Sequence, residues 1–429
     1  MSVETRADAV STDTALADTA RQAENAPDVP GPRRYRNSQK MLEAGEPSWQ
    51  AAAHSGLIGL DVDAESNNDL TVRQTGHRFV NMCSCSYLGL NFDPRIIEGA
   101  VDGVREARAT ALSIASTRIR STLHLRLEEE LGELYRASVL FGASCSALTT
   151  GILPLLASGH LAEGGPRVMV FDRFCHFNMS YVKPICADES LVLTSPHNDL
   201  DYLEDVCRKY PRVAYIADGA YSMGGVLPLE GLLDLQDRYG LFLYLDDSHS
   251  LSAIGGHGEG YVRSRIEMNP LTMIVASLGK AFGTGGGVAM LGRPESADFL
   301  QRHAGPVGWS QNMATPLLGA SLASAAIHRS DELGRLQGAL QDNIAYFDEL
   351  MPTPFAGNSL TVRLITVGEA DRAVELSTEL FRRGYYSSAV FFPIVPKGEA
   401  GLRIMLRADL TRPLIDAFVA EINEITSSF

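Results

Sequence analysis

The sequence lacks the long apolar segments of membrane proteins, and it lacks an excess of positive charge. None of its apolar runs approaches the ~20 residues that span a bilayer, and the N-terminus shows no basic stretch followed by an apolar one. Acidic residues outnumber basic ones by 52 to 37, which gives a net charge of -15. These features argue against nucleic acid or an anionic membrane as the main partner.

Cysteine is also scarce, with six residues in a chain of 429. The six are Cys83, Cys85, Cys145, Cys175, Cys186 and Cys207. Their spacing fits neither a zinc site nor the disulfide framework of a small secreted domain. We therefore expect no metal, and we predict a reduced protein of the cytoplasm.

The sequence does contain enough apolar material for a large core, since 45% of its residues are hydrophobic. Residues 1–34 are rich in Ala, Asp, Thr, Glu and Pro without apolar periodicity, which predicts a disordered tail. We expect an N-terminal segment over 35–85, a large domain over 86–320 and a smaller α+β domain over 321–429.

Segments typical of strands and helices alternate from Arg136 onward, which predicts a mostly parallel sheet with helices on both faces. Strands are expected near 77–83, 168–171, 191–193, 213–217, 241–245, 273–276, 288–291, 360–367, 389–395 and 402–406. Helices are expected over 35–55, 94–106, 123–135 and 321–350, and after Glu369 and Thr411.

The stretch 273–292, MIVASLGKAFGTGGGVAMLG, places one lysine in a glycine-rich turn between two apolar runs. A lysine held between buried strands is costly unless it is paired or used covalently. Burial lowers a lysine pKa, and the neutral amine is the form that attacks an aldehyde. Lys280, with the Ser277 hydroxyl three residues before it, is therefore a candidate attachment site for pyridoxal 5'-phosphate (PLP). The alternative is a surface hairpin with a solvated lysine.

A second stretch, LFLYLDDSH at 241–249, ends an apolar run in acidic residues and a histidine. Ligands of open α/β sheets bind beyond the carboxyl ends of the strands. Asp246 could hold the pyridine nitrogen of PLP protonated, and His249 could donate to the ring oxygen. The alternative is a helix N-cap after the strand, a description that fits Asp247.

These residues lie in a series of motifs that resembles the α-oxoamine synthases, a branch of the fold-type I PLP enzymes. The motifs are CSCSYLGL at 83–90, STLHLRLEEEL at 121–131, DRFCHFN at 172–178, DGAYSMGGVLPL at 218–229, LDDSHS at 245–250, SLGKAFG at 277–283 and GLRIML at 401–406. The resemblance implies a large domain with a mostly parallel seven-stranded sheet and a smaller α+β domain at the C-terminus.

The family condenses an amino acid with an acyl-CoA to give an α-aminoketone with loss of carbon dioxide. For this chain the resemblance implies an acyl thioester and leaves open whether its carrier is CoA or an acyl carrier protein. The resemblance implies that Lys280 carries PLP as a Schiff base and then acts as base on the substrate α-proton. The other residues it implies are Asp246 at the pyridine nitrogen, His249 at the ring oxygen, His176 on the ring face, Asp218 and Ser222 near the ring, Ser277, Ser144 and Cys145 at the phosphate, and Arg403 and Cys85 at the substrate carboxylate.

Some of these residues have ordinary explanations when each is taken alone. His176 could be a core or surface histidine, and Ser222 an ordinary turn serine. Arg403 alternates with apolar neighbours in a strand, so it could face solvent together with Arg407. We take His124, within a leucine-rich helix, to be structural or peripheral.

The resemblance also implies a homodimer with shared active sites. The segment WSQNMATP at 309–316 is similar to the family segment that reaches the phosphate of the neighbouring subunit. Asn312 is the candidate for that contact.

The sequence departs from the family pattern around the substrate pockets. Cys85 stands where most members have an asparagine, Ala147 replaces another asparagine near the phosphate, and Asp409 begins a segment that differs from the usual Ala-His-Thr. The segment 111–124 has far fewer glycines than its counterparts. These departures favour a specialised biosynthetic member.

Two other functions remain open from the sequence alone. An aminotransferase or related amino-acid enzyme would use the same Lys280, Asp246 and His249, because PLP reactions diverge after a shared first step. A catalytically silent partner subunit would be expected to have lost Lys280, which is present. The sequence does not specify the amino acid or the acyl chain.

Overall fold

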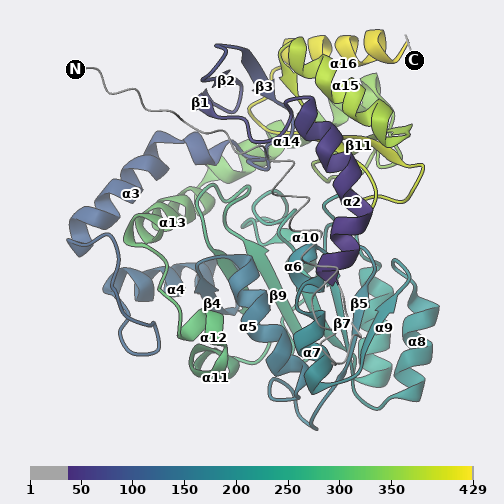
Figure 1. Cartoon of the computed structure of the whole chain (residues 1–429). Coiled ribbons are helices and arrows are strands. Elements are labelled where there is room, and N and C mark those ends of the chain that lie inside the picture. Colours follow the sequence, from purple (N-terminus) through teal and green to yellow (C-terminus); the bar gives the residue numbers. More distant parts are fainter. Residues whose placement is uncertain (1–36, 428–429) are drawn as a thin grey trace, which may run out of the picture. The chain divides into compact units, whose positions relative to one another are not determined.

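A seven-stranded sheet forms the centre of the computed structural model (Figure 1). The structure describes residues 37–427, so the predicted tail over 1–34 lies outside the described residues. In spatial order the strands are β4 (Ser138–Gly142), β10 (Gly287–Leu291), β9 (Thr272–Ser277), β8 (Phe242–Asp246), β7 (Val213–Asp218), β5 (Val168–Asp172) and β6 (Val192–Ser195). β10 runs antiparallel to both of its neighbours, and the other pairs are parallel.

The central strands are buried along their whole length, as expected for a sheet covered on both faces. On one face, Leu127 and Leu131 of α4 (Thr122–Tyr135) share a core with alternate strand residues such as Leu243 and Ile274. On the other face, the Tyr244 hydroxyl donates to Thr149 Oγ1 of α5 (Cys145–Ala157) at 3.0 Å. This two-sided burial confirms the predicted α/β architecture.

Further helices surround the sheet and connect its strands. They are α3 (Pro94–Ala107), α6 (Phe177–Ser180), α7 (Lys183–Glu189), α8 (Leu200–Lys209), α9 (Leu229–Tyr239), α10 (Gly260–Arg263), α11 (Ser296–His303), α12 (Gly305–Gly308), α13 (Thr315–His328) and α14 (Asp331–Leu350), with a 3-10 turn η1 (Leu90–Phe92). None of the helices within residues 37–427 combines the length and the apolar character needed to cross a bilayer.

The C-terminal part is built on a second, three-stranded antiparallel sheet in the order β11 (Val362–Gly368), β14 (Ala400–Met405) and β13 (Ser388–Val390). Helices α15 (Ala370–Arg382) and α16 (Arg412–Thr426) accompany it. Figure 1 shows both helices on the same side of the molecule as the N-terminal strands.

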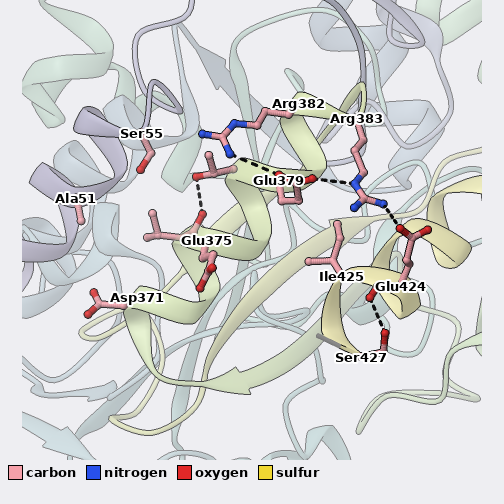
Figure 2. Close-up of a pocket in the computed structure, with 12 residues that line it drawn as sticks. Ala51, Ser55, Asp371, Glu375, Glu379, Arg382, Arg383, Glu424, Ile425 and Ser427 are labelled. Carbon is pink, nitrogen blue, oxygen red and sulfur yellow. Dashed lines mark hydrogen bonds and ion pairs between the residues drawn. The ribbon is translucent and has the colours of Figure 1, made fainter. Parts of the chain in front are cut away.

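The N-terminal strands join the C-terminal part through a third sheet. Its order is β1 (Val62–Ser66), β2 (Asp69–Val72), β3 (Arg78–Asn81) and β12 (Tyr385–Tyr386), and β12 pairs with β3 in parallel. The preceding helix α2 (Asn37–His54) packs near α15. A cavity of about 810 Å³ between α2, α15 and α16 is lined by charged side chains (Figure 2).

Most predicted elements are present, and three predictions need correction. The sequence did not predict β4, which completes the seven-stranded sheet, nor the shorter strands β1, β2 and β12. The helix predicted over 321–350 is two helices, because Ser330 caps a new helix by accepting from Glu332 N–H. The strand predicted near 389–395 ends at Val390, since Pro393 and Pro396 cannot donate to a ladder. The domain boundaries at residues 85 and 320 stay predictions.

Candidate active site

The carboxyl ends of β5, β7, β8 and β9 meet at one edge of the large sheet and carry polar side chains there. They border a cavity of about 150 Å³, together with the start of α5. Its lining residues are Ser144, Cys145, Ser146, His176, Asn178, Asp218, Asp246, Ser248, His249, Ser277 and Lys280. Eight residues singled out from the sequence are thus brought together by strands far apart in the chain.

Asp246 ends β8 and is 3% exposed. Its Oδ1 accepts the Ser248 N–H at 3.0 Å, and its Oδ2 faces the Cys145 Sγ at 3.6 Å. The thiol therefore contacts the Asp246 carboxylate, while the resemblance also implies a place for Cys145 near the phosphate. Burial first, and the Asp246 charge second, raise the pKa of the Cys145 thiol well above its usual range, so the thiol keeps its proton.

A second carboxylate lies beside the first, because Asp218 of β7 is the register partner of Asp246. Asp218 is buried, and its Oδ2 accepts the backbone N–H of His176 at 2.8 Å. Burial, followed by the neighbouring Asp246 charge, raises the pKa of Asp218 well above its usual range. The His176 ring is exposed at the cavity, and its Nδ1 lies 2.9 Å from Asn178 Oδ1.

His249 is held in place by a residue of the loop between β3 and η1. The Tyr87 hydroxyl lies 2.6 Å from His249 Nδ1. Burial is the main cause that lowers the pKa of His249 well below its usual range, helped by the charges of Lys280 and Arg403. Burial also raises the pKa of Tyr87 well above its usual range, so the phenol keeps its proton and can donate it to Nδ1. The remaining proton of the neutral ring is then on Nε2, where it can serve as a donor in the cavity.

Lys280 follows β9 in the glycine-rich turn predicted from the sequence, and it is half-buried. Close packing requires a glycine at position 287, because a Cβ there would lie 2.3 Å from the Cys145 backbone nitrogen. The turn can therefore press against the N-terminus of α5 only if position 287 has no side chain. The backbone N–H of Ser277 donates to Ser248 Oγ at 2.8 Å, which joins the end of β9 to the loop after β8.

The N-terminus of α5 forms one end of the cavity. Ser144 is its N-cap and accepts the Ala147 N–H at 3.0 Å. The other N–H groups of a first helical turn have no partner within the helix, and together with the helix dipole they favour a bound anion. The hydroxyl of Ser277 lies at the same cavity.

Arg403 of β14 lies outside the lining of this cavity and close to it, since its charge lowers the pKa of His249. Its Nη2 faces Cys83 Sγ at 3.9 Å, and its Nε is a buried donor without a hydrogen-bond partner among residues 37–427. A buried, unsatisfied guanidinium nitrogen is costly, which points to an external acceptor. Cys85 is half-buried in the same loop as Cys83.

Three other residues named from the sequence lie elsewhere. Ser222 lines a neighbouring cavity, which Phe174 and Tyr221 also line. Asn312 is half-buried and donates through Nδ2 to the Ile119 carbonyl at 3.3 Å. His124 is buried against the Phe141 ring, and burial lowers its pKa to about 4.

Four residues of the site were not singled out from the sequence: Tyr87, Ser146, Asn178 and Ser248. Tyr87, Asn178 and Ser248 stand inside motifs quoted above, so their neighbours along the chain gave a signal. Their roles depend on contacts between distant segments, which no motif spacing reveals.

The arrangement fits PLP by the chemistry of its donors. It offers a buried carboxylate for the pyridine nitrogen, an imidazole Nε2–H for the ring oxygen, an amine for the aldehyde carbon and a helix N-terminus for the phosphate. The carboxylate and the imidazole come from the end of β8, the amine from the turn after β9, and the phosphate site from the start of α5. The site therefore has the complete set of partners that the cofactor needs.

Comparison with known proteins gives consistent results. The model of the family "aminotransferase class I and II" matches residues 81–422. The 8-amino-7-oxononanoate synthase of Coprothermobacter proteolyticus is 29% identical over 361 residues, which cover 82% of this chain and 88% of the relative. The corresponding synthase of Marinomonas sp. is 28% identical and covers 86% and 92% of the two chains.

Solved structures show the same fold. A serine palmitoyltransferase from S. paucimobilis superimposes with a TM-score of 0.79 at 16% identity, over 92% of this chain and 99% of the other. The 8-amino-7-oxononanoate synthase of Francisella tularensis gives a TM-score of 0.68 at 20% identity, over 82% and 98%.

Proposed function

The chain belongs to the aminotransferase class I and II family, and on this basis we propose that it condenses an amino acid with an acyl thioester to give an α-aminoketone. The predicted resemblance to the α-oxoamine synthases is confirmed by its relatives, and the protein is a PLP-dependent enzyme. The observation that carries the proposal is the combination of the Asp246, His249 and Lys280 cavity with the unsatisfied Arg403 guanidinium beside it.

The chain's own residues would divide the work as follows. PLP, when bound, supplies an electron sink for the charge left on the substrate α-carbon. Asp246 holds a proton on the pyridine nitrogen, and His249 donates its Nε2–H to the ring oxygen. Lys280 holds the cofactor through Nζ and takes the α-proton of the substrate.

The remaining residues orient the reactants. Arg403 holds the amino-acid carboxylate with two parallel hydrogen bonds, which fixes its direction as well as its charge. Ser144, Ser277 and the first turn of α5 hold the phosphate. His176 covers the ring face, and Asp218 fixes the His176 backbone through the 2.8 Å bond.

The test is a panel of amino acids combined with acyl thioesters, each presented on CoA and on an acyl carrier protein. Condensation predicts stoichiometric carbon dioxide and a new α-aminoketone by mass spectrometry, both absent in Lys280→Ala. An aminotransferase would instead exchange the amino group with a 2-oxo acid and release no carbon dioxide. That result would replace the proposal, since it is the alternative on the same fold.

The proposal includes a specialised pathway and a cytoplasmic location. The specialised pathway is supported by the unusual residues Cys85, Ala147 and Asp409. The cytoplasmic location is supported by the six cysteines, which are free thiols. Formation of 8-amino-7-oxononanoate as the preferred product in the panel would contradict the specialised role. Recovery of the native protein with periplasmic or secreted markers would contradict the location.

A homodimer is also part of the proposal. Phe177, Tyr181 and Ile185 are exposed large apolar side chains spaced by four residues beside the site, and Trp309 is 58% exposed in the segment that carries Asn312. Such patches mark interfaces between proteins. Mixing Lys280→Ala with Asn312→Ala subunits tests shared sites, because hybrid dimers should regain activity that neither variant has alone. A fully active monomer in solution scattering would contradict the idea.

A further inference from the structure

A second cavity of about 220 Å³ lies between the large sheet and the C-terminal sheet, and we call it the side chamber. Its walls come from β11 and from the loops after β5, β6, β7 and α14, together with the loop that precedes β14. None of its lining residues has a role in the function proposed above. The chamber is therefore a feature that still needs an explanation.

The side chamber adjoins the cofactor cavity through two shared loops. The loop after β5 places Phe174 in the chamber and His176 in the cofactor cavity. The loop after β7 places Asp218 in the cofactor cavity and Ser222 in the chamber. The bond from His176 N–H to Asp218 ties the two loops together. A ligand that reacts at the cofactor therefore has the chamber within reach.

The chamber also borders the group that would hold the amino acid. Leu364 of β11 is the register partner of Arg403 of β14. Residues directly opposite in an antiparallel pair point to the same face of the sheet, and Thr366 follows Leu364 on that face. Leu364 and Thr366 line the chamber. The same sheet face thus supplies both the guanidinium and the chamber wall.

The walls are mainly apolar. Phe174, Met223, Phe355, Leu364 and Val395 supply hydrocarbon or thioether surface. A Cβ on Gly224 would lie 2.4 Å from a Phe355 ring carbon, so the glycine lets the ring close the wall. Ile394 is 39% exposed and Thr366 is exposed, so this side of the chamber opens to solvent.

One polar residue in the wall is fixed rigidly. His197 Nδ1 lies 3.0 Å from Asp172 Oδ1, and Asp172 also accepts from the Tyr215 hydroxyl at 2.9 Å. The His197 ring packs edge-on against Tyr221, with centroids 4.6 Å apart. A mostly apolar cavity with a few fixed polar groups is typical of small-molecule sites.

We propose that the side chamber binds the acyl chain of the thioester, an inference that rests on the proposed condensation. Its volume lies below the ~300–1,000 Å³ of cavities that enclose drug-sized ligands, which favours a short or medium chain over a long one. Its open side allows a longer chain to extend into solvent with little gain in affinity. A side chain of the amino acid is the competing occupant, and the experiment separates the two.

The experiment measures kcat/KM for unbranched acyl thioesters from acetyl to palmitoyl with one fixed amino acid. Thr366→Trp fills the chamber from an exposed strand position, so the preferred chain should lose at least about tenfold in kcat/KM, which is about 1.4 kcal/mol. The acetyl thioester should change by less than about twofold. Met223→Ala enlarges the chamber and should move the preference toward longer chains.

Lys397→Trp is the matched control, because it adds the same side chain to an exposed position of the loop before β14 that does not line the chamber. It should keep the wild-type length profile. An unchanged profile in both Thr366→Trp and Met223→Ala would overturn the proposal. A shift in amino-acid preference with constant acyl preference would also overturn it, in favour of the amino-acid side chain.

A binding measurement separates this proposal from the proposed function. A medium-chain alkyl-CoA thioether, which cannot react, should bind the wild-type holoenzyme at least about tenfold more tightly than it binds Thr366→Trp. If no amino acid yields product but this difference appears, the chamber assignment stands and the condensation is wrong. If condensation occurs and the thioether binds both proteins equally, the chamber assignment is wrong and the condensation stands.

Discussion

Two cavities of this molecule hold carboxylates under opposite conditions. In the 810 Å³ cavity between α2, α15 and α16, acidic side chains are exposed and several are paired, as Figure 2 shows for Arg383 with Glu379 and Glu424. In the 150 Å³ cavity at the sheet edge, Asp218 and Asp246 are buried side by side. The larger cavity pairs some of its acidic side chains with arginines at the surface, whereas the smaller one keeps two acids together away from water.

The comparison shows that the size of a cavity is a poor guide to chemistry in this protein. Exposed ion pairs contribute little, because water and salt screen them. Burial beside a second carboxylate raises the pKa of Asp218, and such shifts are typical of functional sites. Substitutions in the two cavities should therefore differ strongly in effect.

The largest effect is expected at Lys280. Lys280→Ala removes the amine that holds the cofactor and moves the α-proton, so turnover should fall by about 10⁴-fold, or about 5.5 kcal/mol. The wild-type protein should be yellow and keep PLP covalently after borohydride treatment, and the variant should not. A reduced peptide map with PLP on another lysine would contradict the assignment.

Asp246→Asn should come next, with turnover lower by about 10³-fold, or about 4 kcal/mol, because a neutral amide does not keep the pyridine nitrogen protonated. Glu375→Gln makes the same change in the large exposed cavity and should stay within about twofold of wild type. Steady-state rates of both variants at equal PLP content test the contrast. Similar losses of turnover at the two positions would contradict the difference between the two cavities.

We expect the burial of His328 to make the free energy of unfolding depend on pH. His328 is 2% exposed, and burial lowers its pKa to about 4, against about 6.5 when unfolded. Between these values the unfolded chain binds a proton that the folded protein excludes, so the free energy of unfolding falls as pH drops from about 7 to 4. The full contribution is about 3 kcal/mol.

Urea unfolding at several pH values measures this contribution. His328→Gln should flatten the decline relative to wild type, although it also removes the bonds of His328 to Ser324 and Ser252. His160→Gln changes an exposed histidine and should leave the slope unchanged. Equal slopes in wild type and His328→Gln would show that this histidine titrates alike in both states.

Arg403→Lys should weaken amino-acid binding by about 1.5–3 kcal/mol, because lysine keeps the charge but loses the planar fork. PLP content should not change. Arg382→Lys, in the exposed cavity, is the matched control and should bind the substrate normally. Spectral titration with the true amino acid gives both dissociation constants, and equal values would place the carboxylate elsewhere.

The smallest effect is expected at Arg383, despite its ion pairs with Glu379, Glu421 and Glu424. Arg383→Ala should lower the free energy of unfolding by at most about 1 kcal/mol and leave turnover unchanged. Urea unfolding at low and high salt tests this. A loss above about 3 kcal/mol in the free energy of unfolding would mean that these ion pairs behave like buried ion pairs.

The sequence predicted the sheet and the core of the site because both depend on local patterns. Apolar runs ending in Asp218, Asp246 and Lys280 could be read directly, and parallel strands bring such ends together. The contact of Cys145 with Asp246 could not be predicted from the sequence, since it depends on how α5 packs against Gly287 of β10. The support of His249 by Tyr87 joins residues 162 positions apart, which no motif encodes.

The pairing of β3 with β12 sets a limit on when this protein can fold during its synthesis. Val80 pairs with Tyr385, which comes after all seven strands of the large sheet in the sequence. Arg407, which lies still later in the sequence, donates to the Asn81 carbonyl. At about 5–20 residues per second, β3 waits roughly 15–60 s after it is made before its partner strand exists. An edge strand left open for that long can pair with the wrong chain. Expression at high ribosome density should therefore favour aggregation through the N-terminal strands.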